Sequence, residues 1–111
     1  VGDVGNVVLR DRQHLAEDGI VIISFALDGR SGSLAAGPEI TSRGFVYLKE
    51  ADALMNEADL VAQEAIWKCI DGRVTDYSKI KAAVKNSLGE FFWKKTMRRP
   101  VILPMILEIE D

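Results

Sequence analysis

Ile20-Val-Ile-Ile-Ser-Phe-Ala-Leu27 is the most strongly strand-forming stretch of this chain, and the other elements can be placed around it. β-Branched and aromatic residues dominate the run, and the flanking residues Gly19 and Asp28-Gly29 are typical of turns. A short apolar run between two turns indicates a strand that is buried on both faces. We therefore expect a central strand here.

The neighbouring segments predict two further strands. Asp28 to Ser33 has the composition of a hairpin loop, so a second strand should follow from Leu34. We expect Gly37-Pro38 to interrupt that strand as a bulge, and Glu39 to Tyr47 to resume it. Val101 to Ile109 is predicted to form the last strand.

Two helices are predicted between the second strand and the last one. Glu50 to Ile70 carries an apolar stripe at helical spacing, and Gly72 fits the position just beyond its end. The next helix should begin at Thr75 or Asp76 and run to about Met97. Its Gly89 costs roughly 1 kcal/mol relative to alanine, which we interpret as a sign of tight packing. The two expected stripes are Leu54, Ala58, Val61, Ala62, Ala65 and Cys69, then Tyr77, Ile80, Val84, Leu88, Phe91, Phe92 and Lys95.

These elements predict an α+β fold, a two-layer sandwich in which two long helices cover a roughly three-stranded sheet. The expected order is (short helix)-β-β-α-α-β, with the short helix in the glycine-containing segment before the first strand. We assign residues 1–19 to the end of a linker and residues 20–111 to one domain.

Composition excludes several classes of function. The chain has 111 residues, of which 48% are hydrophobic, and a net charge of -3, so it is not a generally basic nucleic-acid-binding protein. One cysteine, Cys69, and one histidine, His14, provide too few ligands for a metal site. We interpret Cys69 as a small core residue and His14 as an ordinary surface or interfacial residue. No pair of base and activated nucleophile is evident, and no apolar run is long enough to cross a bilayer.

Two groups of cations have alternative interpretations. Lys94, Lys95, Arg98 and Arg99 complement the dipole of a helix that ends there, or they contact RNA or an acidic partner. Arg43 follows Ser42 in a strand with apolar neighbours, where we expect its guanidinium to be buried. It either binds a phosphate or ties the strand to a loop or to a carboxylate such as Glu39.

Three large apolar residues lie off the helical stripes, namely Leu60, Trp67 and Trp93. They either form the flank of a wide buried face or mark an exposed patch for subunit or interdomain packing.

Three separated motifs resemble the C-terminal domain of bacterial ribonuclease J, in the family's order and across essentially the whole chain. They are Val1-Gly-Asp-Val-Gly-Asn-Val-Val-Leu-Arg-Asp-Arg12, Gly37-Pro-Glu-Ile-Thr-Ser-Arg-Gly-Phe-Val-Tyr47 and Lys95-Thr-Met-Arg-Arg-Pro-Val-Ile-Leu-Pro104. The resemblance implies a parent enzyme of the metallo-β-lactamase superfamily, β-CASP branch, that degrades and matures RNA, ribosomal RNA included, as a 5′-to-3′ exonuclease and as an endonuclease.

The resemblance also implies a catalytic site outside this chain. That family binds two metal ions, typically zinc, through a His-x-His-x-Asp-His motif and further histidines, and none of these residues matches a position here. No catalytic or metal-binding residue is carried over. The implied role is a non-catalytic, cytoplasmic domain that supports oligomerisation and full activity. Its implied partners are the enzyme's own catalytic domains, further copies in a dimer or tetramer, and RNA as the enzyme's substrate, with no membrane.

Two functions therefore remain open. The first is an assembly module that uses Leu60, Trp67 and Trp93. The second is an RNA-binding module that uses Arg43, Lys94, Lys95, Arg98 and Arg99, because the β-β-α-α-β order resembles a type II KH domain. KH domains hold the RNA backbone with a Gly-x-x-Gly loop, whereas the loop here, Asp71-Gly-Arg-Val74, has one glycine and an acid.

Overall fold

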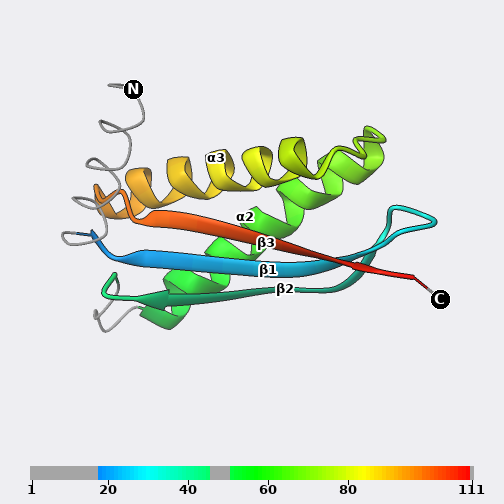
Figure 1. The fold of residues 1–111 in the computed structure, drawn as a ribbon. Helices are drawn as coiled ribbons and strands as arrows, with labels where there is room; N and C mark the ends of the chain where they lie inside the picture. Colours follow the sequence, from blue (N-terminus) through cyan, green and yellow to red (C-terminus); the bar gives the residue numbers. More distant parts are fainter. Residues whose placement is uncertain (1–17, 46–50, 111) are drawn as a thin grey trace, which may run out of the picture.

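A computed structural model describes residues 18–45 and 51–110 of the chain, in which three strands and two helices follow one another. The elements are β1 (Ile20–Asp28), β2 (Leu34–Arg43), α2 (Ala51–Asp71), α3 (Tyr77–Thr96) and β3 (Val101–Ile109). This β-β-α-α-β order and the resulting α+β sandwich confirm the fold expected from the sequence (Figure 1). The expected short helix and His14 fall among residues 1–17, outside the described ranges.

The sheet has the strand order β2-β1-β3, so β1 is the central strand as predicted. β1 and β2 form an antiparallel hairpin, whose turn is held by the Asp28 carboxylate: its Oδ1 accepts hydrogen bonds from the backbone N–H groups of Arg30 and Ser31 at 2.8 and 3.2 Å. β3 pairs with the other side of β1 and runs parallel to it. A parallel pair needs a crossover connection, which α2 and α3 provide.

β2 is irregular where the sequence predicted a bulge. The β1–β2 register shifts between Ser24 and Leu27, opposite the segment that contains the cis peptide Gly37-Pro38. The strand ends at Arg43, so the predicted continuation toward Tyr47 is wrong at Gly44 and Phe45. Gly44 has a φ of 68°, which turns the chain. Phe45 then packs edge-on against Phe92 in the core, with ring centres 4.9 Å apart.

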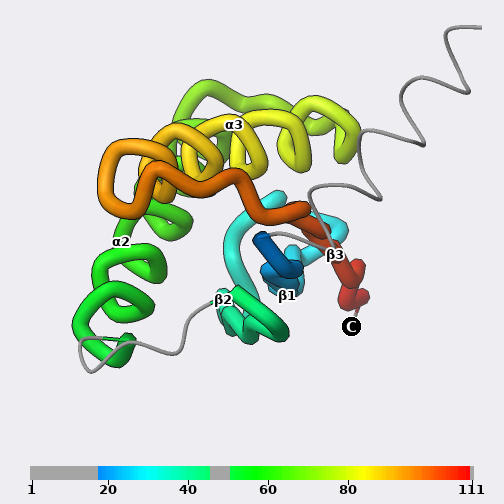
Figure 2. The backbone as a smooth tube through the Cα atoms, turned by 90° about the vertical axis from the view of Figure 1, so that its left-hand side faces the viewer, coloured from blue at the N-terminus to red at the C-terminus, as the bar shows by residue number. Residues whose placement is uncertain are grey.

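Both helices lie on one face of the sheet, and the hydrophobic core is between them and that face (Figure 2). The prediction that β1 is buried on both faces is therefore wrong: its residues alternate between buried and partly exposed from Ile20 to Ser24, and α2 and α3, the helices among the described elements, cover one face. No polar or charged side chain is buried in the described ranges. The buried apolar side chains form one cluster. The core side chains of the strands are Val21, Ile23, Phe25, Leu27 and Ile102, and those of the helices are Ala58, Ala62, Ala65, Ile66, Cys69, Ile80, Val84, Leu88 and Phe92.

The ends of the helices agree with expectation except after α2. Asp76 caps α3 as predicted, because its carboxylate accepts a hydrogen bond from the Ser78 N–H at 2.9 Å. After α2, however, Arg73 adopts the left-handed conformation (φ 58°), and Gly72 does not. Met97 is left-handed in the same way (φ 57°) and caps α3, which confirms the predicted end of this helix at about Met97. Both positions place a side chain where glycine is preferred.

Gly89 does not occupy a site that is too tight for a side chain. A Cβ atom added at Gly89 would lie 3.7 Å from Cδ1 of Ile102, which is an ordinary van der Waals contact. The interpretation of Gly89 as a tight-packing residue is therefore wrong.

Candidate interaction surfaces

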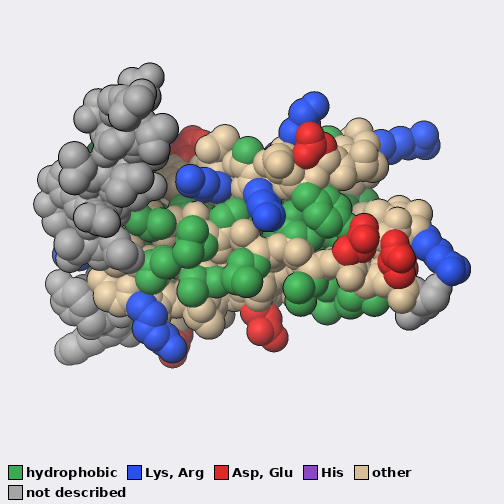
Figure 3. Space-filling model, viewed as in Figure 1, with side chains coloured by type: hydrophobic (Ala, Val, Ile, Leu, Met, Phe, Trp, Pro, Cys, Tyr) green, Lys and Arg blue, Asp and Glu red, His purple; other side chains and the backbone are tan. Residues whose placement is uncertain are grey.

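The face of the sheet that the helices leave uncovered carries several exposed apolar side chains. Side chains alternate along a strand, so the odd-numbered residues of β3 point away from the helices. Four of these side chains are well exposed: Leu103 (45%), Met105 (54%), Leu107 (63%) and Ile109 (42%). The even-numbered Ile102, in contrast, is buried. Figure 3 shows hydrophobic side chains gathered over β1 and β3, with charged side chains around them.

The other two strands extend this surface. Directly opposed residues share a face of a sheet, so the register assigns each β1 residue its neighbours. Ile20, Ile22 and Ser24 of β1 stand opposite Arg43, Thr41 and Glu39 of β2, and opposite Val101, Leu103 and Met105 of β3. We call these nine residues, together with Leu107 and Ile109, the open face. It has two apolar rows, on β3 and β1, and one polar row, on β2.

The outer edge of β3 has one missing hydrogen-bond donor. Val101 donates its N–H to the Gly19 carbonyl, and the Ile109 carbonyl accepts from the Gly29 N–H, so odd-numbered residues direct their backbone groups toward β1. The even-numbered residues must then point outward, since this direction alternates along a strand. Pro104 is one of them. Its lack of an N–H leaves the β1–β3 ladder intact and interrupts the outer edge of β3, with which neither of the other two described strands pairs.

A second apolar surface lies on α2. Leu60 and Trp67, two turns apart on the helix, are 64% and 62% exposed. They line a groove of about 500 Å³ together with Leu34, at the start of β2, and Ile70. Both residues were candidates for subunit or interdomain packing, and the structure places them in one groove and exposes them. Their interpretation as the flank of a buried face is wrong.

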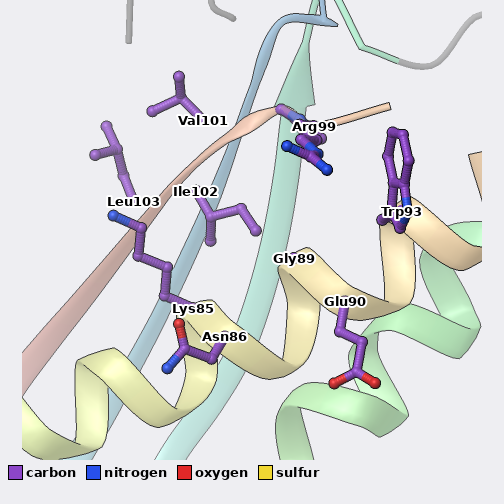
Figure 4. A pocket seen from close by; sticks show the side chains of 10 residues that line it. Lys85, Asn86, Gly89, Glu90, Trp93, Arg99, Val101, Ile102 and Leu103 are labelled. Carbon is purple, nitrogen blue, oxygen red and sulfur yellow. The ribbon is translucent and has the colours of Figure 1, made fainter. Parts of the chain in front are cut away.

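Trp93 lies elsewhere, in a groove of about 450 Å³ between α3 and β3. The Arg99 guanidinium carbon is 4.4 Å from the centre of the Trp93 ring, a cation–π arrangement. Figure 4 shows Ile102 pointing from β3 toward Gly89, while Val101 and Leu103 point away from the helix. Lys85 and Asn86 contribute polar groups to the same groove. Trp93, a candidate for subunit or interdomain packing, and Arg99, a candidate for RNA binding, therefore line the same groove.

The basic cluster is partly neutralised by carboxylates. Lys94 forms an ion pair with Glu90 one turn earlier, at 2.9 Å, and Lys95 joins α3 to α2 through Glu57 at 3.3 Å. Both pairs are well exposed, so each stabilises the fold by less than about 1 kcal/mol. The backbone N–H of Arg98 donates to Thr96 Oγ1 at 3.1 Å.

Arg99 is also held through its backbone, because its N–H donates to the Asp18 carboxylate at 2.8 Å. Arg43 is exposed, and the prediction that its guanidinium is buried is wrong. The register places it opposite Ile20 on the open face, and its guanidinium donates a hydrogen bond to the Ser42 carbonyl at 3.0 Å.

Sequence reasoning missed the open face. β3 carries apolar residues at both even and odd positions, from Val101 to Leu107, as a strand with two covered faces does. Two helices following a hairpin can cover one face of a three-stranded sheet. The apolar residues on both faces of this strand therefore indicated that one apolar face of the sheet would remain uncovered by the helices.

The described residues offer little for catalysis. Cys69 is buried in the core, and burial raises the pKa of its thiol, which confirms its interpretation as a core residue and disfavours the reactive thiolate. No group of three or more His, Cys, Asp or Glu side chains that could hold a metal ion occurs within residues 18–45 and 51–110. Neither α2 nor α3 is long and apolar enough to span a membrane.

Comparison with known proteins agrees with the resemblance that the sequence motifs carry. The family model described as the ribonuclease J C-terminal domain matches residues 7–109. The chain is 47% identical over 109 residues to ribonuclease J 2 of Staphylococcus saprophyticus, 44% identical to ribonuclease J 2 of Staphylococcus aureus and 39% identical to ribonuclease J2 of Bacillus subtilis. Each alignment covers 98% of this chain and 20% of the relative. The chain therefore belongs to the ribonuclease J C-terminal domain family.

Proposed function

We propose that this chain is the non-catalytic C-terminal domain of an RNA-degrading and RNA-maturing enzyme of the ribonuclease J type, and that it supports assembly of that enzyme. The parent's 5′-to-3′ exonuclease and endonuclease activities, its two metal ions and its cytoplasmic location belong to this proposal. The residues within 18–45 and 51–110 do not fit such a metal site, because they contain no cluster of His, Cys, Asp or Glu ligands. Catalysis is therefore assigned to the rest of the parent.

The open face is the observation that supports an assembly role. A sheet with one bare apolar face gains free energy when that face is removed from water, at about 25 cal/mol per Å² of apolar area. Apolar rows surrounded by charged side chains have the anatomy of an interface, with a hydrophobic centre and a polar rim (Figure 3). The proposed partners are a further copy of the parent or its own catalytic domains.

Two matched methionine substitutions test the assembly role. In the full-length parent protein, Met105→Lys places a charge on the open face, and Met97→Lys places the same charge at the end of α3. The two methionines are similarly exposed, 54% and 66%, so neither change disturbs the core. Sedimentation velocity should show smaller assemblies for Met105→Lys and unchanged ones for Met97→Lys. Unchanged assembly of the Met105→Lys protein would contradict the proposal.

Contact with RNA phosphates is a second candidate function, supported by the groove between α3 and β3. Arg99, Trp93 and Lys85 offer charge and a stacking surface at one site, which is the combination that single-stranded nucleic acids favour. Arg43 and Arg98 remain candidates for further phosphate contacts. So do Lys94 and Lys95, because their exposed ion pairs are weak and can exchange with other anions.

Salt-dependent binding tests this second function. A single-stranded RNA oligonucleotide should bind the chain at about 50 mM salt, and the slope of log affinity against log salt should become shallower by roughly one for each phosphate-binding cation removed. We expect that change for Arg99→Ala and for Lys85→Ala. Lys68→Ala, a change to an exposed cation of α2 that pairs with Glu64, serves as the control. Absence of binding at low salt would contradict this function.

A further inference from the structure

We infer that the groove between α3 and β3 holds one unstacked nucleobase of single-stranded RNA above Gly89, between the Arg99 guanidinium and the Ile102 side chain. The inference rests on the proposed contact with RNA phosphates, and it adds a base to that site and a role for Gly89. Three features of the groove support it: a glycine that the fold does not require, a guanidinium held by Trp93, and a second cation one helical turn before the glycine.

Gly89 weakens α3 without a reason in the packing of the fold. Glycine in the interior of a helix is less favourable than alanine. Of the described atoms, only Cδ1 of Ile102 would lie within 4 Å of a Cβ added at Gly89, at 3.7 Å. Both residues line the groove, so that Cβ would narrow it. The glycine therefore keeps the floor of the groove free of side-chain atoms, which allows a flat ligand to approach the helix backbone closely.

Arg99 offers a flat cation beside this floor. Its guanidinium carbon lies 4.4 Å from the centre of the Trp93 ring, and its backbone N–H donates to the Asp18 carboxylate at 2.8 Å. In the view of Figure 4 the guanidinium lies between Trp93 and Ile102, above Gly89. A guanidinium stacks on a base through its plane and donates to a phosphate through its N–H edge. The side of the guanidinium that faces away from Trp93 is therefore the surface on which the base stacks.

Lys85 supplies a second cation on the same side of α3. Lys85, Gly89 and Trp93 follow one another at intervals of four residues, so they lie one above the other along the helix. A base above Gly89 thus has Lys85 one turn before it and the pair of Trp93 and Arg99 one turn after it. Cations on both sides suit an internal nucleotide of a single strand, which has a phosphate before and after it. The Asn86 amide, which lines the same groove, can donate to or accept from the edge of the base.

The size and the walls of the groove favour a base over a peptide. Its volume of about 450 Å³ is within the range of small-ligand sites, roughly 300–1,000 Å³. An extended peptide would instead gain its affinity by pairing with the outer edge of β3, where Pro104 removes a donor. Glu90 also lines the groove, but its carboxylate pairs with Lys94 at 2.9 Å and points away from Trp93 in Figure 4, so it does not face the base.

Two oligomers with equal charge test for the base. Fluorescence anisotropy measures the affinity of the chain for a short oligouridine and for an abasic oligomer with the same number of phosphates, at about 50 mM salt. We expect oligouridine to bind about tenfold more tightly or better, because the stacking of one base contributes about that factor. Contacts to phosphates alone would give the two oligomers the same affinity.

Three variants locate the base in the groove. Gly89→Ala should remove most of the difference between the oligomers and leave the slope of log affinity against log salt unchanged, because it fills the floor and removes no cation. Arg99→Lys should do the same, since lysine keeps the charge and lacks the plane. Asn56→Ala, at an exposed position of α2, is the matched control, because it also replaces a poorer helix former with alanine. It should leave both affinities unchanged, and urea unfolding should show that all three variants are folded.

The outcomes that overturn this inference differ from those that overturn the phosphate contact. Equal affinity for the two oligomers, or a Gly89→Ala chain that keeps the full difference, rejects the base site. If Lys85→Ala and Arg99→Ala still make the salt slope shallower in these cases, the phosphate contact stands without a base. If neither oligomer binds at low salt, the phosphate contact is rejected and the base site with it. If Gly89→Ala leaves RNA binding unchanged and alters the sedimentation of the full-length parent, the groove holds protein and the inference is rejected.

Discussion

Pro104 lies opposite Ile23 of the central strand, within the parallel ladder of β1 and β3, and its ring disrupts no bond of that ladder. The outward direction of its backbone explains why a proline is accepted in the middle of a nine-residue strand. Because the backbone of Pro104 points outward and has no N–H, Pro104 also hinders the pairing of another strand with the outer edge of β3.

The first prediction follows from this barrier. Pro104→Val supplies the missing N–H and a side chain with high strand propensity, so the edge of β3 becomes continuous. We expect concentration-dependent growth of large assemblies, measured by light scattering. Leu103→Val, at the neighbouring position whose backbone faces β1, is the control and should not produce them. Equal behaviour of Pro104→Val and the unchanged chain would show that Pro104 does not protect the edge.

The second prediction concerns the end of α3. Met97 has a left-handed backbone, which costs an L-residue about 1–2 kcal/mol and glycine almost nothing. Met97→Gly should therefore raise the free energy of unfolding in urea by about 1 kcal/mol. Met97→Ala keeps the strained backbone and removes the exposed side chain, so it should give no such gain. A gain of the same size from alanine would assign the effect to the side chain.

The third prediction contrasts two glycines. Gly89→Ala should stabilise the fold by roughly 1 kcal/mol, because alanine is the better helix former and its Cβ meets only Cδ1 of Ile102, at 3.7 Å. Gly37→Ala should destabilise it, because Gly37 has a φ of 84° and an added Cβ would lie 2.9 Å from the Ser24 carbonyl oxygen. Urea unfolding of both variants checks the opposite signs. A loss of stability for Gly89→Ala would contradict the description of the groove.

The fourth prediction is a pH dependence at Tyr77. Its hydroxyl donates to Glu108 Oε1 at 3.1 Å, and desolvation, this hydrogen bond and the charges of Glu108 and Glu110 raise its pKa. The folded state thus favours the protonated phenol. The resulting stability is fully present below the unfolded pKa of about 10 and is lost as the pH rises through the higher folded value.

Ultraviolet titration in a Tyr47→Phe background isolates Tyr77, because the chain has two tyrosines. Glu108→Gln should lower the pKa of Tyr77 toward its ordinary value. Glu90→Gln, on the exposed side of α3 where Glu90 pairs with Lys94, should leave it unchanged. Equal titration of Tyr77 in all three proteins would show that Glu108 has no influence on the phenol.

The fifth prediction uses the single cysteine as a reporter of the core. Cys69 of α2 is buried in the hydrophobic core, and burial raises the pKa of its thiol. Reaction with a thiol-specific disulfide reagent at pH 8 should be slow in the folded chain and fast in urea, because the thiolate is the reactive form. Fast labelling without denaturant would contradict the buried position.

Much of this fold was predictable because its signals are local. The turn residues around β1 and at Gly37-Pro38, the stripe of α3 and the Asp76 cap each act over a few neighbouring residues, so the pattern indicates the element directly. The end of α2 was less predictable. Gly72 is the expected left-handed residue, yet Arg73 takes that conformation, because the turn is closed by a hydrogen bond from the Val74 N–H to the Cys69 carbonyl.

The interaction surfaces depend on contacts between distant segments. Strand alternation shows that β3 has two different faces, but only the packing of α2 and α3 shows that the face with Leu103 is the uncovered one. The grouping of Trp93 with Arg99, and of Leu60 with Leu34, results from how helices and strands pack together. Local sequence patterns specify each helix or strand and the face that it turns to the core. A surface formed by several elements depends on how those elements are placed relative to one another. That placement is set by the burial of apolar area between segments that are distant in the sequence.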